Sequence, residues 1–309
     1  MALLSALMLS GCITSRVLDY ALKSDRQKDE AAYRGAFDGY KLSHPGEKAW
    51  VEAFTDTFIV SDYDGKRLHA IYRKADIPTP KTAFIIHGYG GSAAGMLPYA
   101  RFYGSELGYN VFLPDVQAHG LSEGTMKRMG WLDRLDMLQW MRLANSIFSI
   151  DGKDTEMVVT GVSMGGATTM MVSGEVEERG MTFVRCLVED CGYTDVYDQF
   201  SSVAKGRFTS VLDKADKKCQ RQEGWGFREA SSVSQVAKCH LPMLFIHGGS
   251  DTYVPTRMVY EVFASKPGTK EIWIPDGVTH AEAFYAQDRT YKNKVRDFLS
   301  RYLTPMPNQ

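Results

Sequence analysis

From residue 81 onward, short apolar runs alternate with amphipathic stretches, and this alternation limits the possible folds more than any other feature of the chain. The apolar runs have the length of strands, whereas the stretches between them have helical periodicity. Apolar strands separated by helices predict a mostly parallel sheet with helices on both faces. The predicted strands are 83–86, 110–113, 157–160, 183–188, 242–246 and 271–274, and the clearest predicted helices are 131–148, 256–264 and 291–303.

The region before residue 81 differs, because its β-rich runs lie next to each other. Residues 52–60 and 68–73 flank the turn pair Asp64-Gly65, which predicts a hairpin. Residues 12–50 form a predicted N-terminal helical segment, and 51–309 form one α/β domain with a mixed sheet. Residues 193–238 are polar, aromatic and irregular, so we expect them to form an insertion over the edge of the sheet.

The overall charge is balanced, with 36 Lys and Arg against 37 Asp and Glu, which gives a net charge of -1. A dedicated nucleic-acid surface needs an excess of cations to displace the counterions of phosphate groups. We therefore expect no nucleic-acid partner. The absence of a Cys-x-x-Cys pair also argues against a zinc site.

The first twelve residues bear on localisation. Residues 1–9 are apolar, and Leu9-Ser10-Gly11-Cys12 resembles the lipobox of a bacterial lipoprotein signal. The resemblance implies removal of residues 1–11 as a signal peptide and lipid attachment to Cys12. The protein would then be anchored to a membrane of the bacterial cell envelope, outside the cytoplasm. The alternative is a cytosolic protein with a buried Cys12, since no basic residue precedes Arg16.

Four further cysteines leave two interpretations open. An oxidising envelope permits disulfides, and Cys219 with Cys239 is the more plausible pair. Cys186 and Cys191 flank a predicted strand and are too far apart along it to bridge each other. The other interpretation is that all four are free, buried thiols.

The strongest chemical signal is the segment Gly161-Val162-Ser163-Met164-Gly165, which follows a predicted strand and precedes an apolar helical run. This context is typical of a nucleophile elbow, a tight strand-to-helix turn that exposes a serine. Glycines flank the serine because larger residues would clash in such a turn. Ser163 is therefore the candidate nucleophile.

A serine hydroxyl needs a base to take its proton and a carboxylate to orient that base. Asp251 and His280 each follow one of the last two predicted strands, so both should lie at the carboxyl edge of the sheet. Ser163, Asp251 and His280 occur in this order along the chain, and each follows a predicted strand, so all three are expected to meet at that edge. Asp190, which ends an earlier strand, is an alternative acid. The remaining candidates have expected structural roles: His87 and His247 precede glycines, His119 holds a loop, and Asp276 shapes the turn before His280.

An oxyanion needs two preorganised donors. The amide of Met164, directly after the nucleophile, is one candidate. The amide of Tyr89 is the other, because it lies in the glycine-rich loop after an early strand.

Together, these motifs resemble the α/β-hydrolase superfamily, close to bacterial esterase-like members. The resemblance rests on His87-Gly88, the stretch from Asp115 to Ser122, the elbow at Ser163, the Asp251 loop and His280. It implies a mostly parallel eight-stranded sheet with a cap after the sixth strand, here about 193–238. The shortness of this cap favours an open site over a deep tunnel.

The resemblance implies a serine hydrolase that cleaves a small-molecule acyl ester through an acyl-enzyme, without a metal or an organic cofactor. Peptidase or thioesterase action would use the same atoms, and an inactive binding lipoprotein is a further alternative. Nucleotide binding at residues 88–93 with Asp115 is disfavoured, because it leaves Ser163, Asp251 and His280 unexplained. Aromatic residues near the cap either line an acyl or aryl pocket or pack the cap; they are Tyr193, Tyr197, Phe200, Phe208, Trp225 and Phe227.

Overall fold

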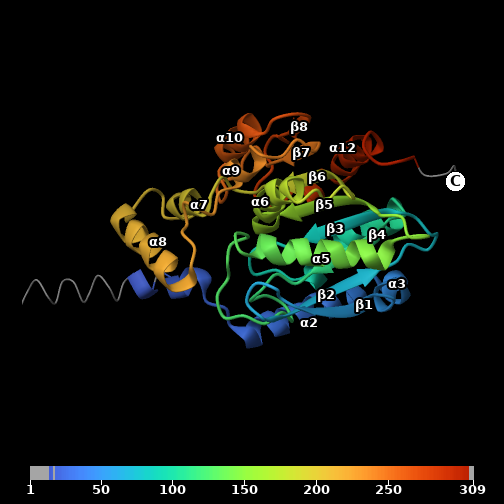
Figure 1. Cartoon of the computed structure of the whole chain (residues 1–309), viewed down its shortest axis with the longest axis horizontal. Helices are drawn as coiled ribbons and strands as arrows, with labels where there is room; N and C mark the ends of the chain where they lie inside the picture. Colours follow the sequence, from blue (N-terminus) through green and yellow to red (C-terminus); the bar gives the residue numbers. More distant parts are fainter. Residues whose placement is uncertain (1–13, 17, 306–309) are drawn as a thin grey trace, which may run out of the picture.

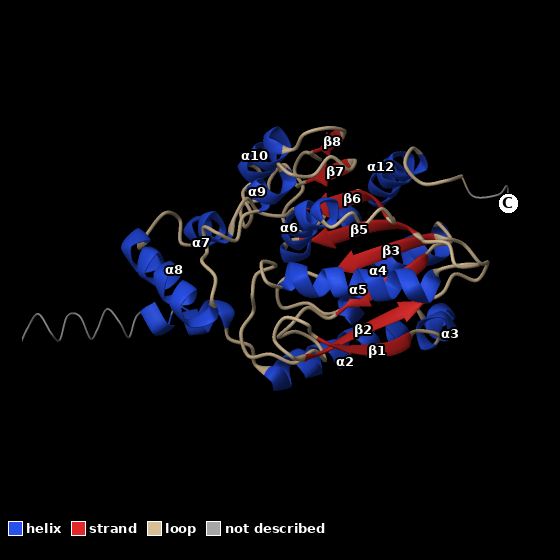
Figure 2. Cartoon of the chain, viewed as in Figure 1, coloured by secondary structure: helices blue, strands red, loops and turns tan. Residues whose placement is uncertain are grey.

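The computed structural model describes residues 14–16 and 18–305. Its core is one eight-stranded sheet with the order β1-β2-β4-β3-β5-β6-β7-β8. Figures 1 and 2 show the sheet running through the body of the molecule with helices on both sides. The strands are β1 (Thr55–Val60), β2 (Arg67–Arg73), β3 (Lys81–Ile86), β4 (Asn110–Pro114), β5 (Glu156–Val162), β6 (Val184–Asp190), β7 (Met243–Ile246) and β8 (Lys270–Trp273).

The strand directions confirm the predicted mixed, mostly parallel sheet. Strand β2 is antiparallel to both of its neighbours, β1 and β4, and all pairings from β4 through β8 are parallel. Burial follows position in the sheet. Every residue of β3 and β4 is buried, as expected for parallel strands covered on both faces, whereas the edge strand β1 is partly exposed along its length.

Helices cover each face and bury separate apolar cores. One core joins the sheet to α5, α6 and α10, and the other joins it to α4, η3, α11 and α12. The helices outside the segment between β6 and β7 have the following bounds: α2 (Arg26–Ser43), η1 (Pro45–Glu47), α3 (Lys48–Glu52), η2 (Ala93–Met96), α4 (Leu97–Arg101), η3 (Phe102–Glu106), α5 (Asp133–Phe148), α6 (Met164–Glu178), α10 (Arg257–Ser265), α11 (Ala283–Ala286) and α12 (Asp288–Ser300).

The segment between β6 and β7 forms three helices, α7 (Val196–Val203), α8 (Thr209–Glu223) and α9 (Ser232–Val236). Helix α9 packs against α6, whereas α7 and α8 extend away from the sheet and form a cap (Figure 1). Ser15, Leu18 and Leu22 lie beside α8. Nζ of Lys218 donates a hydrogen bond to Oγ of Ser15 at 2.5 Å, and Leu18 and Leu22 join the same core as Leu212 of α8.

The four described cysteines are free and buried, so the proposed Cys219–Cys239 disulfide is absent and the free-thiol interpretation holds. Burial raises the pKa of Cys219 to about 12, which keeps its thiol protonated and unreactive at neutral pH. The predicted lipobox and Cys12 lie outside the described residues. Among the described helices, none combines the length and apolar character that a membrane span requires.

Candidate active site

Ser163 lies at the tip of the turn that joins β5 to α6. Its backbone has φ 59° and ψ -118°, a sparsely populated conformation that stores strain and holds the side chain outward. The flanking glycines make the turn possible: a Cβ on Gly161 would overlap the carbonyl of Gly165, and a Cβ on Gly165 would overlap the carbonyl of Ile86. The Ser163 amide donates to the Asp190 carbonyl at 2.8 Å, which fixes the turn to β6.

The structure brings Ser163, His280 and Asp251 together in one hydrogen-bonded chain. Nε2 of His280 lies 2.8 Å from Oγ of Ser163, and Nδ1 of His280 lies 2.6 Å from Oδ2 of Asp251. With the Nδ1 proton donated to Asp251, Nε2 is free to accept the serine proton. The loops after β7 and β8 supply the acid and the histidine, so all three groups meet at the carboxyl edge of the sheet.

Several donors hold the carboxylate of Asp251 in its ionised form. Its Oδ1 accepts hydrogen bonds from the amides of Tyr253 and Val254, each at 2.9 Å. Burial would raise the pKa of Asp251, but the hydrogen bonds with His247 and His280 outweigh burial and lower it to about 2. Asp251 therefore stays charged at neutral pH, where it can stabilise a protonated His280.

The alternative residues have structural roles. Asp190 is fully buried, burial raises its pKa to about 6, and it makes no hydrogen bond to His280 among the described residues. His87 links its own loop to the next strand, since its Nδ1 donates to the Gly88 carbonyl and its Nε2 accepts from the Val116 amide. His119 donates from Nδ1 to the Gln117 carbonyl at 3.0 Å within its loop.

Asp115, the residue that suggested nucleotide binding, is occupied within the protein. Its carboxylate bonds to Nδ1 of His69 at 2.7 Å and accepts from the amides of Ala93 and Leu121. These bonds tie together β2 and the loops after β3 and β4. The carboxylate has no open side for a ribose, so the structure gives Asp115 a role in loop positioning.

The two candidate oxyanion donors lie beside Ser163. Met164 opens α6, and the first amides of a helix have no carbonyl partner within the helix. The amide of Tyr89 donates to no other group in the described part of the chain. Gly88 places its Cα directly against Ser163, since a Cβ there would lie 3.3 Å from Cβ of Ser163. This close approach brings the Tyr89 loop to the nucleophile.

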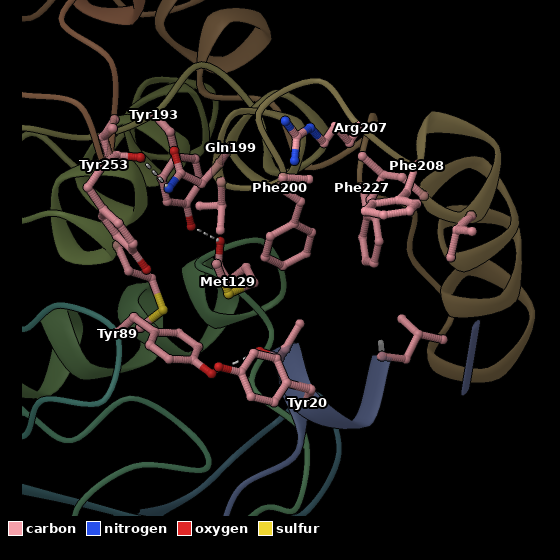
Figure 3. A pocket seen from close by; sticks show the side chains of 18 of the residues that line it. Tyr20, Tyr89, Met129, Tyr193, Gln199, Phe200, Arg207, Phe208, Phe227 and Tyr253 are labelled. Carbon is pink, nitrogen blue, oxygen red and sulfur yellow. Dashed lines mark hydrogen bonds between the residues drawn. The ribbon is translucent and has the colours of Figure 1, made fainter. Parts of the chain in front are cut away.

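A cavity of about 990 Å³ adjoins Ser163 beneath the cap (Figure 3). The aromatic residues singled out in the sequence divide into two groups. Tyr193, Phe200, Phe208 and Phe227 line the cavity, whereas Trp225 and Tyr197 do not. The opposite wall comes from the N-terminal segment, with Arg16, Leu18, Tyr20 and Ala21, which sequence reasoning had not connected to the site.

One set of three potential metal ligands was found among the described residues, Cys191 with Asp251 and His280. This set does not fit a resident metal ion. Both ring nitrogens of His280 are already bonded, to Ser163 and to Asp251. Burial also raises the pKa of the Cys191 thiol well above its ordinary value, which disfavours the thiolate that metals bind.

Comparison with known proteins agrees with this geometry. The profile of the prolyl oligopeptidase family matches residues 102–300, a span that includes Ser163, Asp251 and His280. The chain belongs to the prolyl oligopeptidase family. Membership in this family, together with the fold, makes the protein a serine hydrolase of the α/β-hydrolase type and confirms the superfamily that the motifs resembled.

Similar proteins span most of the chain. The Bacillus subtilis (strain 168) protein YqkD, described only as uncharacterized, is 25% identical over 302 residues, covering 96% of this chain and 94% of its own length. The Pyrococcus furiosus esterase Pf2001 superposes with a TM-score of 0.62 at 22% identity, covering 81% of this chain and 92% of that chain. The Pyrococcus horikoshii acylaminoacyl peptidase gives a TM-score of 0.61 at 15% identity, covering 86% of this chain and 44% of that chain. The last two likenesses concern the fold.

The sequence predicted a structural role for His247 and none for Glu189, and both residues are buried near the loop of Asp251. His247 lies 3.4 Å from Oδ2 of Asp251, and Glu189 bonds to the amide of Gly192 at 3.0 Å. Burial raises the pKa of Glu189 to about 8. The sequence signal for both was present, since each lies at or just beyond a strand end, but spacing alone does not show which strand ends meet.

Proposed function

We propose that the protein hydrolyses carboxylic esters through an acyl-enzyme on Ser163. Oγ of Ser163 attacks the ester carbonyl while its proton passes to Nε2 of His280. The Asp251 carboxylate stabilises the resulting imidazolium through Nδ1. The amides of Met164 and Tyr89 stabilise the negative charge that develops on the carbonyl oxygen. His280 then gives its proton to the leaving alkoxide, and the alcohol departs.

The second half of the reaction repeats these roles with water. His280 takes a proton from the water, whose oxygen attacks the acyl-enzyme carbonyl. The same two amides stabilise the second tetrahedral intermediate. His280 then returns the proton to Oγ of Ser163, and the carboxylic acid is released. No step requires a cofactor.

The observation that carries this proposal is the continuous chain from Ser163 through His280 to Asp251, opening onto an apolar cavity. Among the residues that the structure describes, no Asp or Glu lines the cavity. A peptidase that grips the free amino group of a substrate needs a carboxylate near the nucleophile. The apolar walls instead fit an uncharged acyl group.

Peptide hydrolysis is the second candidate, because the family is named for a peptidase. An amide differs from an ester at one step: His280 must protonate a poorly leaving nitrogen before the bond breaks. Thioester hydrolysis would use the same residues with a sulfur leaving group. The leaving group therefore separates the three activities.

Matched substrates test this proposal. A para-nitrophenyl ester, the corresponding para-nitroanilide and an acyl thioester, all with the same acyl group, are assayed with the full-length protein and with Ser163→Ala. We expect kcat/KM to be largest for the ester and hydrolysis to be lost in Ser163→Ala. Anilide hydrolysis within about tenfold of ester hydrolysis would instead assign a peptidase. Binding without turnover of any of the three would favour the inactive binding lipoprotein.

We further propose that Cys12 carries a lipid and anchors the enzyme in the bacterial cell envelope. The lipobox residues Leu9-Ser10-Gly11-Cys12 support this localisation. Expression in a bacterial host followed by membrane fractionation tests the anchor. Wild-type protein is expected in the membrane fraction with a mass increase on Cys12, and Cys12→Ser in the soluble fraction. Equal fractionation of both proteins would refute the anchor.

A further inference from the structure

The cavity beside Ser163 is enclosed by two segments that are far apart in the sequence. Phe200, Phe208 and Phe227 come from the cap region, and Tyr20 and Tyr89 face them from the other side (Figure 3). The hydroxyl of Tyr89 donates to the carbonyl of Ala21 at 2.9 Å and so fastens the N-terminal wall to the oxyanion loop. The short cap alone predicted an open site. The N-terminal segment supplies the missing wall and turns that site into a cavity.

The chemistry of the walls selects the kind of ligand. Most lining side chains are aliphatic or aromatic, and Arg16 and Arg207 are the charged ones in the described part of the chain. Neither arginine makes an ion pair with another described residue. At about 990 Å³, the cavity lies at the upper end of the usual range for small-molecule sites, about 300–1,000 Å³. An acetyl group would leave most of this apolar wall without a partner.

We propose that the cavity binds the hydrocarbon chain of a long-chain fatty acyl group, so that the enzyme's substrates are long-chain acyl esters. This proposal rests on the ester hydrolysis proposed above and names its substrate class. The apolar lining begins at Ser163 and Met164 themselves, which places the first carbons of the acyl chain against apolar wall directly beyond the carbonyl. The far lining extends to Val211 and Leu212 of α8.

The mouth of the cavity is also apolar. Val203 and Phe208 of the cap and Tyr20 of the N-terminal segment line the cavity while remaining exposed, with Tyr20 at 91% and Phe208 at 73%. Exposed large apolar residues gathered at one opening mark a surface for an apolar ligand. A long acyl chain covers both the inner wall and part of this rim, whereas a compact aryl group reaches the inner wall alone.

A chain-length series measures the effect. The full-length protein is assayed with para-nitrophenyl esters from acetyl to palmitoyl, each below its critical micelle concentration. Each methylene transferred from water to an apolar wall is worth up to about fourfold in binding. We expect kcat/KM to rise at least about tenfold from butyryl to lauryl ester. A maximum at acetyl or butyryl ester would overturn the proposal.

Two variants of α8 locate the chain. Val211→Trp places an indole in the cavity from a partly buried helical position, and Lys214→Trp places the same side chain at an exposed position of α8 that does not line it. Val211→Trp should lower the ratio of lauryl to butyryl kcat/KM at least about tenfold, whereas Lys214→Trp should leave this ratio unchanged. Equal ratios in the two variants would show that the acyl chain of the substrate does not lie against Val211. Circular dichroism confirms that both variants fold.

A binding measurement separates this proposal from the proposed function. Ser163→Ala cannot form an acyl-enzyme, yet its cavity is intact. Titration with laurate, followed by displacement of a fluorescent fatty-acid analogue, should give saturable binding that Val211→Trp weakens at least about tenfold. Laurate binding without ester hydrolysis by the wild type would refute the catalytic proposal and keep the cavity assignment. Ester hydrolysis without laurate binding would do the reverse.

Discussion

Nε2 of His247 lies 3.4 Å from Oδ2 of Asp251, so one buried carboxylate is shared by two histidines. His247 also donates to the Val254 carbonyl at 2.9 Å, which fixes its ring. Burial would lower the pKa of His247, but its contact with Asp251 raises it. The fixed ring of His247 lies against Oδ2 of Asp251 and helps to hold that carboxylate in line with His280.

This relationship makes His247 a positioning residue whose effect can be measured. His247→Leu removes the polar ring that contacts Oδ2 of Asp251, and we expect kcat for a butyryl ester to fall about tenfold. KM should stay the same, because His247 does not line the cavity. His247→Gln keeps a donor and should recover part of kcat. Equal loss of kcat in both variants, or a loss confined to KM, would contradict the positioning role.

The orientation of His280 depends on Asp251 more directly. Asp251→Asn keeps the size of the side chain but removes its charge and favours the wrong tautomer of His280. We expect kcat to fall about 10³- to 10⁴-fold while the protein remains folded. Asp190→Asn serves as the control, since Asp190 was the alternative acid, and should leave catalysis within about tenfold. A larger loss in Asp190→Asn than in Asp251→Asn would reassign the acid.

Glu189 predicts a specific dependence of stability on pH. Burial raises the pKa of Glu189 to about 8 from 4.5, although His247 and the Gly192 amide oppose the shift. Between these values the folded protein keeps a proton that the unfolded chain has released, so the free energy of unfolding falls as pH rises. Glu189→Gln has no proton to lose. Relative to the wild type, it should gain about 3 kcal/mol between about pH 5 and pH 8.

Urea unfolding of both proteins at the two pH values provides the measurement. The amide of Gln can still accept the hydrogen bond from Gly192, so the comparison changes the titration and keeps the packing. Parallel pH dependence in wild type and Glu189→Gln would mean that Glu189 is already ionised in the folded protein.

The tight elbow predicts a contrast between two glycines. Gly161→Ala would drive a Cβ into the carbonyl of Gly165, where neighbouring backbone has no room to move, and should cost several kcal/mol of stability, about 3 or more. Gly39→Ala in α2 meets nothing within 4 Å and should stabilise the protein by up to about 1 kcal/mol. Urea unfolding at neutral pH measures both. Similar midpoints would show that the turn relaxes easily.

Much of this architecture follows from local sequence patterns. The eight predicted strands are present within a few residues of their expected bounds. Local patterns find them because a short apolar run is what a strand buried in the sheet requires. Ser163, Asp251 and His280 were identified because each follows a strand end, and parallel strands deliver their carboxyl ends to one edge. Because the three residues share this edge, the sequence predicted that their side chains meet.

The features that local patterns did not reveal depend on contacts between distant segments. Tyr20 and Ala21 line the cavity only because Tyr89 and Lys218 hold the N-terminal segment in place. The Cys219–Cys239 disulfide was one of two interpretations and depended on an oxidising envelope; the structure leaves both thiols free and buried. The role of His247 depends on its distance from Asp251, which periodicity does not specify.

The most direct test of the account is the activation of Ser163. The full-length protein and Ser163→Ala are treated with a fluorophosphonate, and the intact mass of each is measured. The account predicts one covalent adduct on the wild type, lost when the protein is unfolded first, and no adduct on Ser163→Ala. An unmodified, correctly folded wild type, or an adduct that persists in Ser163→Ala, would contradict the assignment of Ser163 as the nucleophile.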